Sequence, residues 1–150
     1  MQAPSQGETI QFRIPGDPKY VSPIRRAIRS IARSLGFPEE FAQDIEMSVA
    51  EALANAVEHG SPGHKRNAVV ITCKVGEDSL TIDVRDEGPG FEPLGVGEAC
   101  NLLEEQGRGL RMIYQLMDRV KVRRTPKGSR IRMVKSKRLA QETVRANTPR

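Results

Sequence analysis

Two pairs of short apolar segments, each joined by a tight turn, constrain the fold of this chain more than any other feature. The first pair covers residues 67–75 and 80–85, and the second covers residues 119–124 and 129–135. The turn sequences are GEDS and TPKG, and such residues between two β-prone runs are typical of a hairpin. Because tight turns connect neighbouring strands in antiparallel pairs, the sequence predicts a mostly antiparallel sheet.

Apolar periodicity predicts the remaining elements. Residues 8–14 alternate between apolar and polar, as a half-buried strand does. A first helix is indicated by the helical spacing of Ile24, Ile28, Ile31 and Leu35. Gly36 ends it, Pro38 begins a second helix that runs to Gly60, and a third follows within LRMIYQLMD. Helices grouped against such a sheet predict an α/β two-layer sandwich with the helices on one face.

The length of 150 residues suits one domain. We expect a flexible N-terminus over residues 1–7, one domain over 8–135 and a basic flexible tail over 136–150. Residues 119–150 hold 12 Lys/Arg and one acidic residue, a net charge of +11, whereas residues 1–118 have a net charge of −6. A basic end can bind nucleic acid or an acidic protein. A solvated strand face with a disordered tail is favoured, because the tail lacks aromatic residues for base stacking, so nucleic acid is not expected as a partner.

Apolar runs and cysteines give further limits. No apolar run approaches the about 20 residues that a membrane helix needs, and the start MQAPSQGETI lacks an apolar signal segment. These features predict a cytoplasmic protein without a membrane partner. Cys73 and Cys100 lack the spacing of a metal or redox motif and are interpreted as structural.

The second predicted helix presents a polar face beside its apolar stripe. Glu51 and Asn55 are one turn apart at about 100° per residue, so their side chains reach the same small volume. An amide oxygen can ligate Mg²⁺, and a carboxylate can accept a proton from an attacking hydroxyl or water. Taken alone, this pair also fits an ordinary solvated face.

An acidic, glycine-rich turn, DEGPGF, follows the strand LTIDVR directly. The carboxylate of Asp86 can accept a hydrogen bond from an exocyclic amine such as that of adenine. Gly88 and Gly90 let the backbone approach a planar ring closely. An ordinary acidic turn is the alternative interpretation.

A third motif, Gly107-Arg108-Gly109, precedes the last predicted helix. Exposed N–H groups and the helix dipole favour an anion such as a phosphate at a helix start. A plain helix entry fits this motif equally well by itself. The three motifs occur in a fixed order at element boundaries, and together they favour an ATP site.

The segments EALANAVEHG, DEGPGF and GRGL resemble the N box, G1 box and G2 box of the GHKL ATPase superfamily, which includes gyrase, the Hsp90 chaperone, histidine kinases and MutL. The resemblance spans about residues 8–135 and implies a Bergerat ATP-binding fold. The short single-domain form is similar to the anti-sigma-factor serine kinases of the RsbW type.

The resemblance implies roles for individual residues. Asn55 matches the Mg²⁺ ligand, Glu51 the catalytic base and Asp86 the residue that recognises adenine. The other cofactor-binding positions that it implies are Gly88, Gly90, Gly107, Arg108, Gly109 and Ser129. Arg25 aligns with a partner-contacting arginine. The segment 92–106 is interpreted as a lid; it looks shorter than in known family kinases, and Arg108 can substitute for a basic residue that these often carry just before the G2 box.

The implied function is a protein serine/threonine kinase that uses ATP and Mg²⁺. It would phosphorylate a small anti-sigma-factor antagonist and sequester a sigma factor, and a homodimer is expected. The alternative is a non-catalytic ATP-binding module that binds a sigma factor or another regulator. A fragment of a histidine kinase is disfavoured, because the only histidines, His59 and His64, lie within or just after the N box.

Overall fold

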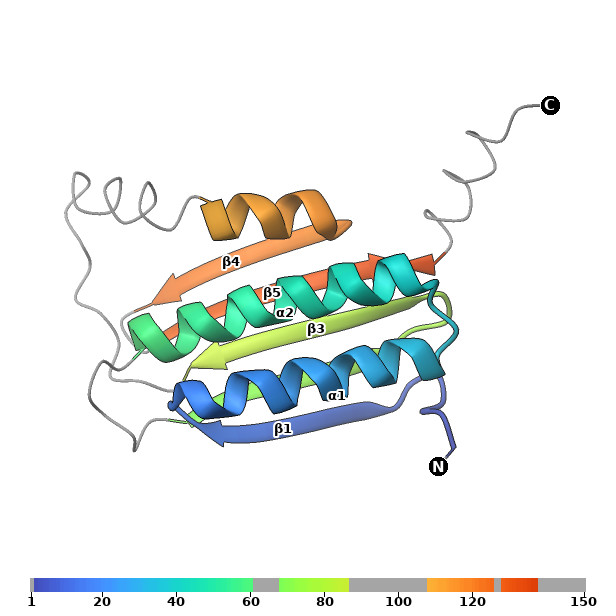
Figure 1. Cartoon of the computed structure of the whole chain (residues 1–150), viewed down its shortest axis with the longest axis horizontal. Helices are drawn as coiled ribbons and strands as arrows, with labels where there is room; N and C mark the ends of the chain where they lie inside the picture. Colours follow the sequence, from blue (N-terminus) through green and yellow to red (C-terminus); the bar gives the residue numbers. More distant parts are fainter. Residues whose placement is uncertain (1, 61–67, 87–107, 126–127, 138–150) are drawn as a thin grey trace.

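The sheet contains five strands, and every hydrogen-bonded pair in it is antiparallel. The computed structural model describes residues 2–60, 68–86, 108–125 and 128–137. The strands are β1 (Thr9–Pro15), β2 (Ala68–Val75), β3 (Ser79–Asp86), β4 (Arg119–Thr125) and β5 (Gly128–Ser136). Their order in space is β1-β2-β3-β5-β4, with β1 and β4 at the edges (Figure 1). The two hairpins that the sequence predicts are therefore confirmed.

Helices cover one face of this sheet (Figure 1). A short 3-10 turn, η1 (Pro18–Tyr20), leads into α1 (Val21–Ser34), and α2 (Glu39–Gly60) follows. A further helix spans residues 108–116. Gly36 ends the first helical segment with a φ of +85°, a conformation that glycine adopts without strain. The predicted two-layer sandwich is confirmed, and none of the described helices is long and apolar enough to cross a membrane.

The core lies between the helices and the inward face of the sheet. Ile28 from α1 and Ile45 and Leu53 from α2 are fully buried. They meet apolar side chains of the three central strands, such as Ile71, Ile82 and Met133, which are also fully buried. Burying each side chain of this size contributes roughly 1.5–3 kcal/mol. Apolar side chains alternate with polar ones along β2, β3 and β5, and this alternation determines which face of the sheet packs against the helices.

Several sequence predictions fall outside the described residues. These are the segment 92–106, which is interpreted as a lid, and Cys100 and His64. The tail beyond residue 137 is also outside them. Cys73 is described: it is fully buried, and burial raises the pKa of its thiol to about 12. A buried thiol with a raised pKa is unreactive, in agreement with a structural role.

Candidate functional site

Four chain segments end or begin at the same end of the sandwich. The second half of α2, the end of β3, the start of β5 and the start of the helix over residues 108–116 all lie at the left of Figure 1. The predicted site residues that the structure describes on these segments are Glu51, Asn55, Asp86, Arg108, Gly109 and Ser129.

Asp86, the last residue of β3, lies against the first residues of β5. It is only 4% exposed. The Ser129 N–H donates a hydrogen bond of 3.2 Å to Asp86 Oδ2, and the Ser129 hydroxyl donates a short one to the same oxygen. The β3–β5 register, which pairs Arg85 with Arg130, brings these residues together although they are far apart in sequence. These two hydrogen bonds hold the Asp86 carboxylate in place beside the start of β5.

Gly128 allows this close approach. Its φ is +136°, in the region that L side chains rarely adopt. A Cβ at this position would lie 2.5 Å from the carbonyl oxygen of Asp86 and 2.8 Å from Asp86 Oδ1. Because the first of these atoms is backbone, a larger residue would displace the end of β3 itself.

Glu51 of α2 lies against the start of the helix over residues 108–116. A Cβ on Gly109 would lie 2.5 Å from Glu51 Oε2, so the carboxylate sits directly on the backbone of this glycine. Asn55 is one helical turn further along the same side of α2, and both side chains are half-buried. The N-box helix and the glycine motif therefore meet, as an ATP site would require.

The remaining predicted residues are distributed as follows. Arg108 is exposed at the start of the helix over residues 108–116. Gly88, Gly90 and Gly107 lie outside the described residues.

Among the described residues, no group of three or more His, Cys, Asp or Glu side chains could hold a metal ion. A Mg²⁺ ion bound at Asn55 would therefore need phosphate oxygens and water as further ligands, which is how this ion commonly binds beside nucleotides.

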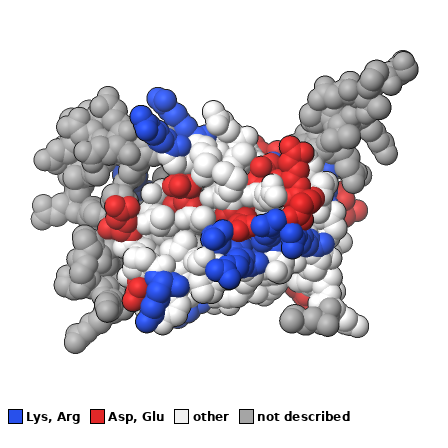
Figure 2. Space-filling model, viewed as in Figure 1, with Lys and Arg blue, Asp and Glu red and all other residues white. Residues whose placement is uncertain are grey.

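Arg25 belongs to an ion-pair network between α1 and α2. Its guanidinium donates to Glu46 Oε1 at 2.6 Å and to Ser22 Oγ at 3.2 Å. The guanidinium of Arg29 forms an ion pair of 2.7 Å with Glu46 Oε2, and Glu46 is only 7% exposed. Basic and acidic side chains gather side by side over the two helices in Figure 2. Arg25 thus has a structural role on the helix layer, separate from the contacts of Asp86 and Glu51.

Glu39 extends this network at the start of α2. Arg33 donates to both of its carboxylate oxygens, at 2.7 and 2.5 Å, and Arg29 also donates to it. Hydrogen bonds from Arg33 and then Arg29 lower the pKa of Glu39 from 4.5 to about 2. The first and second helices are therefore joined by charge as well as by apolar packing.

Lys135 is a residue that the sequence argument missed. It lies on the inward face of β5 and is only 6% exposed. Its Nζ donates to the carbonyl oxygen of Leu116 and lies 3.4 Å from Asp44 Oδ2. It also lies 4.8 Å from the centre of the Phe41 ring. This lysine ties the end of the helix over residues 108–116 to α2, and its inward place in the alternation Ile131, Met133, Lys135 was the available signal.

Fold, motifs and contacts together define a class of protein. Residues 14–135 match the family of histidine kinase-like ATPase domains, and the chain belongs to that family. The match covers most of the chain and includes all the site residues described above. The predicted resemblance to GHKL ATPases is confirmed.

Curated relatives narrow the comparison. The chain is 32% identical over 124 residues to the serine-protein kinase RsbW of Listeria monocytogenes, covering 77% of this chain and 79% of the relative. It is also 32% identical over 127 residues to the serine-protein kinase RsbW of Bacillus subtilis, covering 79% of each. The predicted similarity to the RsbW type is therefore confirmed.

Solved structures support the fold. A Mycobacterium tuberculosis protein with RsbU and RsbW domains aligns with a TM-score of 0.65 and 17% identity, covering 86% of this chain and 32% of that longer protein. The histidine kinase domain of a blue-light-activated kinase from Erythrobacter litoralis aligns with a TM-score of 0.60 and 24% identity, covering 98% of this chain and 70% of that one. At these identities the likeness concerns the fold alone.

Proposed function

We propose that this chain binds Mg-ATP at the shared end of β3, β5 and α2 and transfers the γ-phosphoryl group to a serine of a partner protein. The observation that carries the proposal is the contact between Glu51 and Gly109. It brings a carboxylate to a helix start, where phosphates are favoured. The name shared by the curated relatives, serine-protein kinase RsbW, supports the same reaction.

Different residues would bind the adenine, the metal ion and the phosphates of ATP. Asp86, held by Ser129, accepts a hydrogen bond from the exocyclic amine of adenine. Asn55 would supply an oxygen ligand for Mg²⁺, and the ion would supply positive charge that offsets the charge of the phosphates. Backbone N–H groups around Gly109 receive the phosphates, with Arg108 exposed beside them.

Glu51 acts as the base in the transfer step. The serine oxygen of the partner forms a bond to the γ-phosphorus while the bond from that phosphorus to the bridging oxygen of ADP breaks. Glu51 takes the proton of the serine hydroxyl as this occurs. Most of the acceleration in such a reaction comes from positioning and electrostatics, which the close packing of Glu51 on Gly109 supplies.

The resemblance to anti-sigma-factor kinases suggests two protein partners. The substrate would be a small antagonist protein, and a sigma factor would be the protein that is sequestered. We assign Arg25 to the partner surface, with Glu46 holding its guanidinium in place. A homodimer is part of the same proposal.

The test measures ATP binding and phosphoryl transfer side by side. Asn55→Ala should weaken Mg-ATP binding in calorimetry by at least about tenfold, because a metal ligand is removed. Glu51→Gln should bind Mg-ATP within about threefold of the unchanged chain but lose roughly 10²-fold or more in transfer of ³²P from γ-labelled ATP. The substrate offered in the transfer assay is a small anti-sigma-factor antagonist protein that carries a phosphorylatable serine.

Glu40→Gln is the matched control, because it makes the same chemical change at an exposed position in the first turn of α2. It should leave both measurements unchanged. Full transfer by Glu51→Gln would remove Glu51 as the base. Tight ATP binding without serine phosphorylation by the unchanged chain would instead identify a non-catalytic ATP-binding module.

A further inference from the structure

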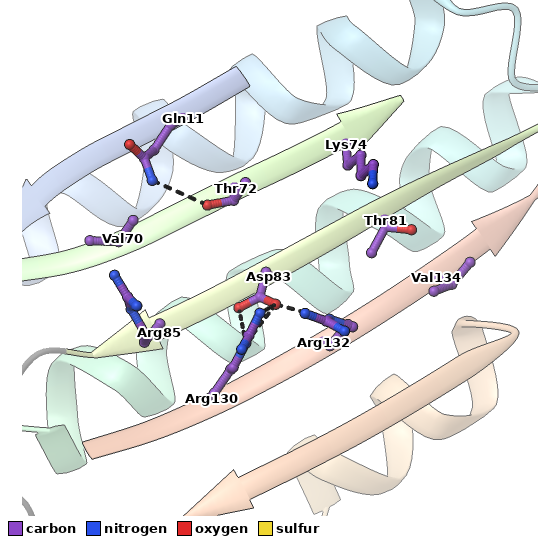
Figure 3. A pocket seen from close by; sticks show the side chains of 10 residues that line it. All are labelled: Gln11, Val70, Thr72, Lys74, Thr81, Asp83, Arg85, Arg130, Arg132 and Val134. Atoms are coloured by element: carbon purple, nitrogen blue, oxygen red, sulfur yellow. Dashed lines mark hydrogen bonds and ion pairs between the residues drawn. The ribbon is translucent and has the colours of Figure 1, made fainter. Parts of the chain in front are cut away.

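The face of the sheet opposite the helices is strongly basic. Side chains on this face alternate with the core residues along each strand. The basic residues there, assigned by strand register, are Arg13, Lys74, Arg85, Arg119, Lys121, Arg123, Arg130 and Arg132. Four of them, Lys74, Arg85, Arg130 and Arg132, line an open depression of ≈ 460 Å³ on this face (Figure 3). None of the described helices crosses it.

Like charges lie directly opposite one another at three positions of this face. Arg130 lies directly opposite Arg85 on one side and Arg123 on the other, and Arg132 lies opposite Lys121. Like charges directly opposite on neighbouring strands are destabilising. Asp83 offsets part of this repulsion through its ion pairs with Arg130 and Arg132, and an anionic partner would offset more of it.

Asp83 is the sole acidic residue that the described strands place on this face. Arg130 forms an ion pair of 2.7 Å with it, and Arg132 one of 3.0 Å (Figure 3). Because Asp83 also accepts hydrogen bonds from the Nε atoms of both arginines, it fixes the orientation of their guanidinium groups. One carboxylate orders two neighbouring arginines and leaves the face with a large positive excess.

The composition of the face argues against a protein partner. Protein interfaces depend on aromatic or aliphatic anchors near their centre. Within the described strands, this face carries no aromatic, leucine, isoleucine or methionine side chain, and its two valines are Val70, which is buried, and Val134. A second copy of the chain would oppose the same positive charges.

We propose, contrary to the expectation from the sequence of the basic tail, that this face binds the phosphate backbone of double-stranded DNA without reading its sequence. Basic side chains recur about every 5 Å across strands and about 7 Å along them. B-DNA carries one negative charge per about 1.7 Å of its axis, and guanidinium groups pair with phosphates through two hydrogen bonds. Single strands are disfavoured because the described part of the face offers no ring for base stacking. This surface lies on the side of the sheet opposite the helices. DNA binding there would therefore be a function separate from the proposed kinase activity.

The test compares two double variants of the full chain. Lys121→Gln with Arg123→Gln removes two charges from β4, where both side chains are exposed. Lys19→Gln with Arg26→Gln removes one lysine and one arginine from exposed positions outside the sheet, in η1 and α1. Affinity for a labelled 20-base-pair duplex is measured by fluorescence anisotropy between about 50 and 200 mM salt.

The β4 variant should bind the duplex roughly tenfold more weakly at the lowest salt, with a log–log salt slope shallower by about 1.8, or about 0.9 per lost phosphate contact. The control should retain the slope of the unchanged chain. Unchanged melting temperature and Mg-ATP affinity establish that both variants fold.

Four outcomes would overturn the proposal. Equal weakening in both variants would attribute binding to net charge alone. Equal or tighter binding of the single strand, or tighter binding of duplex RNA, would exclude duplex DNA as the ligand. Tighter binding of polyglutamate than of the duplex would identify an acidic protein partner.

Discussion

The two ends of β5 carry opposite kinds of residue. At its start, Gly128 and Ser129 lie in direct contact with Asp86. Near its other end, Lys135 and Lys137 extend long side chains to the last carbonyl groups of two helices. Small residues bring two strands together where the nucleotide is proposed to bind, whereas long cationic residues bridge between the sheet and the helices at the far end.

At the lysine end, the same interaction occurs twice: a lysine ammonium group donates to a carbonyl oxygen at the end of a helix. Lys135 Nζ donates to the carbonyl oxygen of Leu116, and Lys137 Nζ donates to that of Leu35, the residue that caps α1. Each ammonium group also lies near a phenylalanine ring, at 4.8 Å for Lys135 and 5.4 Å for Lys137. Helix C-termini leave carbonyl groups unpaired and favour cations. Substitutions at this end should therefore change the stability of the fold, and those at the glycine end should change ATP binding.

The largest effect is expected from Gly128→Ala. The positive φ costs an L residue about 1–3 kcal/mol, and the new Cβ would meet the Asp86 carbonyl oxygen at 2.5 Å. Because relief of this clash moves Asp86, affinity for ATP should fall at least about tenfold, which corresponds to about 1.4 kcal/mol. Isothermal calorimetry measures the affinity, and urea unfolding measures the loss of stability.

Gly36→Ala is the matched control for this substitution. Gly36 also has a positive φ, +85°, but the nearest atom to its new Cβ would be Lys137 Nζ at 3.9 Å. It should lose stability for the same backbone reason while its affinity for ATP remains unchanged. If both alanine variants bind ATP as the unchanged chain does, the close approach at Gly128 has no role in the site.

The glycine end was largely predictable from the sequence. Tight turns and apolar alternation are local signals, so both hairpins and the three helices could be expected in place. The family resemblance assigned both Asp86 and Ser129 to the cofactor site, whereas the hydrogen bonds between them depend on the register of two strands that are distant in sequence. The contact of Glu51 with Gly109 required knowledge of how α2 packs.

The lysine end could not be predicted in the same way. The strand alternation places Lys135 inward, but a lysine normally indicates a solvated position. The partners that allow its burial, Leu116 and Asp44, are known only from the fold. The partner contact expected of Arg25 stays a prediction, and its pairing with Glu46 could not be expected because it depends on the packing of α1 against α2. Charged residues find partners through tertiary structure, which sequence periodicity does not encode.

Lys135→Met is expected to have the second largest effect. Methionine can replace the apolar stem of lysine, but it leaves the Leu116 carbonyl without this donor, which costs about 1–3 kcal/mol for a buried group. The melting temperature should fall by roughly 2–4 °C per kcal/mol in a chain of this size. Thermal unfolding followed by circular dichroism measures the change.

The same variant, once folded, should bind Mg-ATP within about threefold of the unchanged chain, because Lys135 lies at the end of β5 away from the proposed nucleotide site. A tenfold change in affinity would correspond to about 1.4 kcal/mol. Lys137→Met, at a less buried position, should lose less stability. A large loss of ATP affinity with an unchanged melting temperature would reverse the assignment of the two ends.

The smallest effect is expected from Glu39→Gln, on the ion-pair network near the end of α1. The pKa of Glu39 is lowered from 4.5 to about 2 in the folded chain, so the folded state holds this proton less tightly than the unfolded state. Its stabilisation is therefore present above about pH 4.5 and is lost as the pH falls towards 2. Urea unfolding between about pH 3 and pH 7 should show the unchanged chain losing its stability advantage over Glu39→Gln only below about pH 4.5.

ATP affinity should be equal in the two proteins at pH 7. A stability difference that stays constant down to the lowest pH would mean that the network does not act through the ionised carboxylate, and the helix ends would then be held by packing and the two lysines alone.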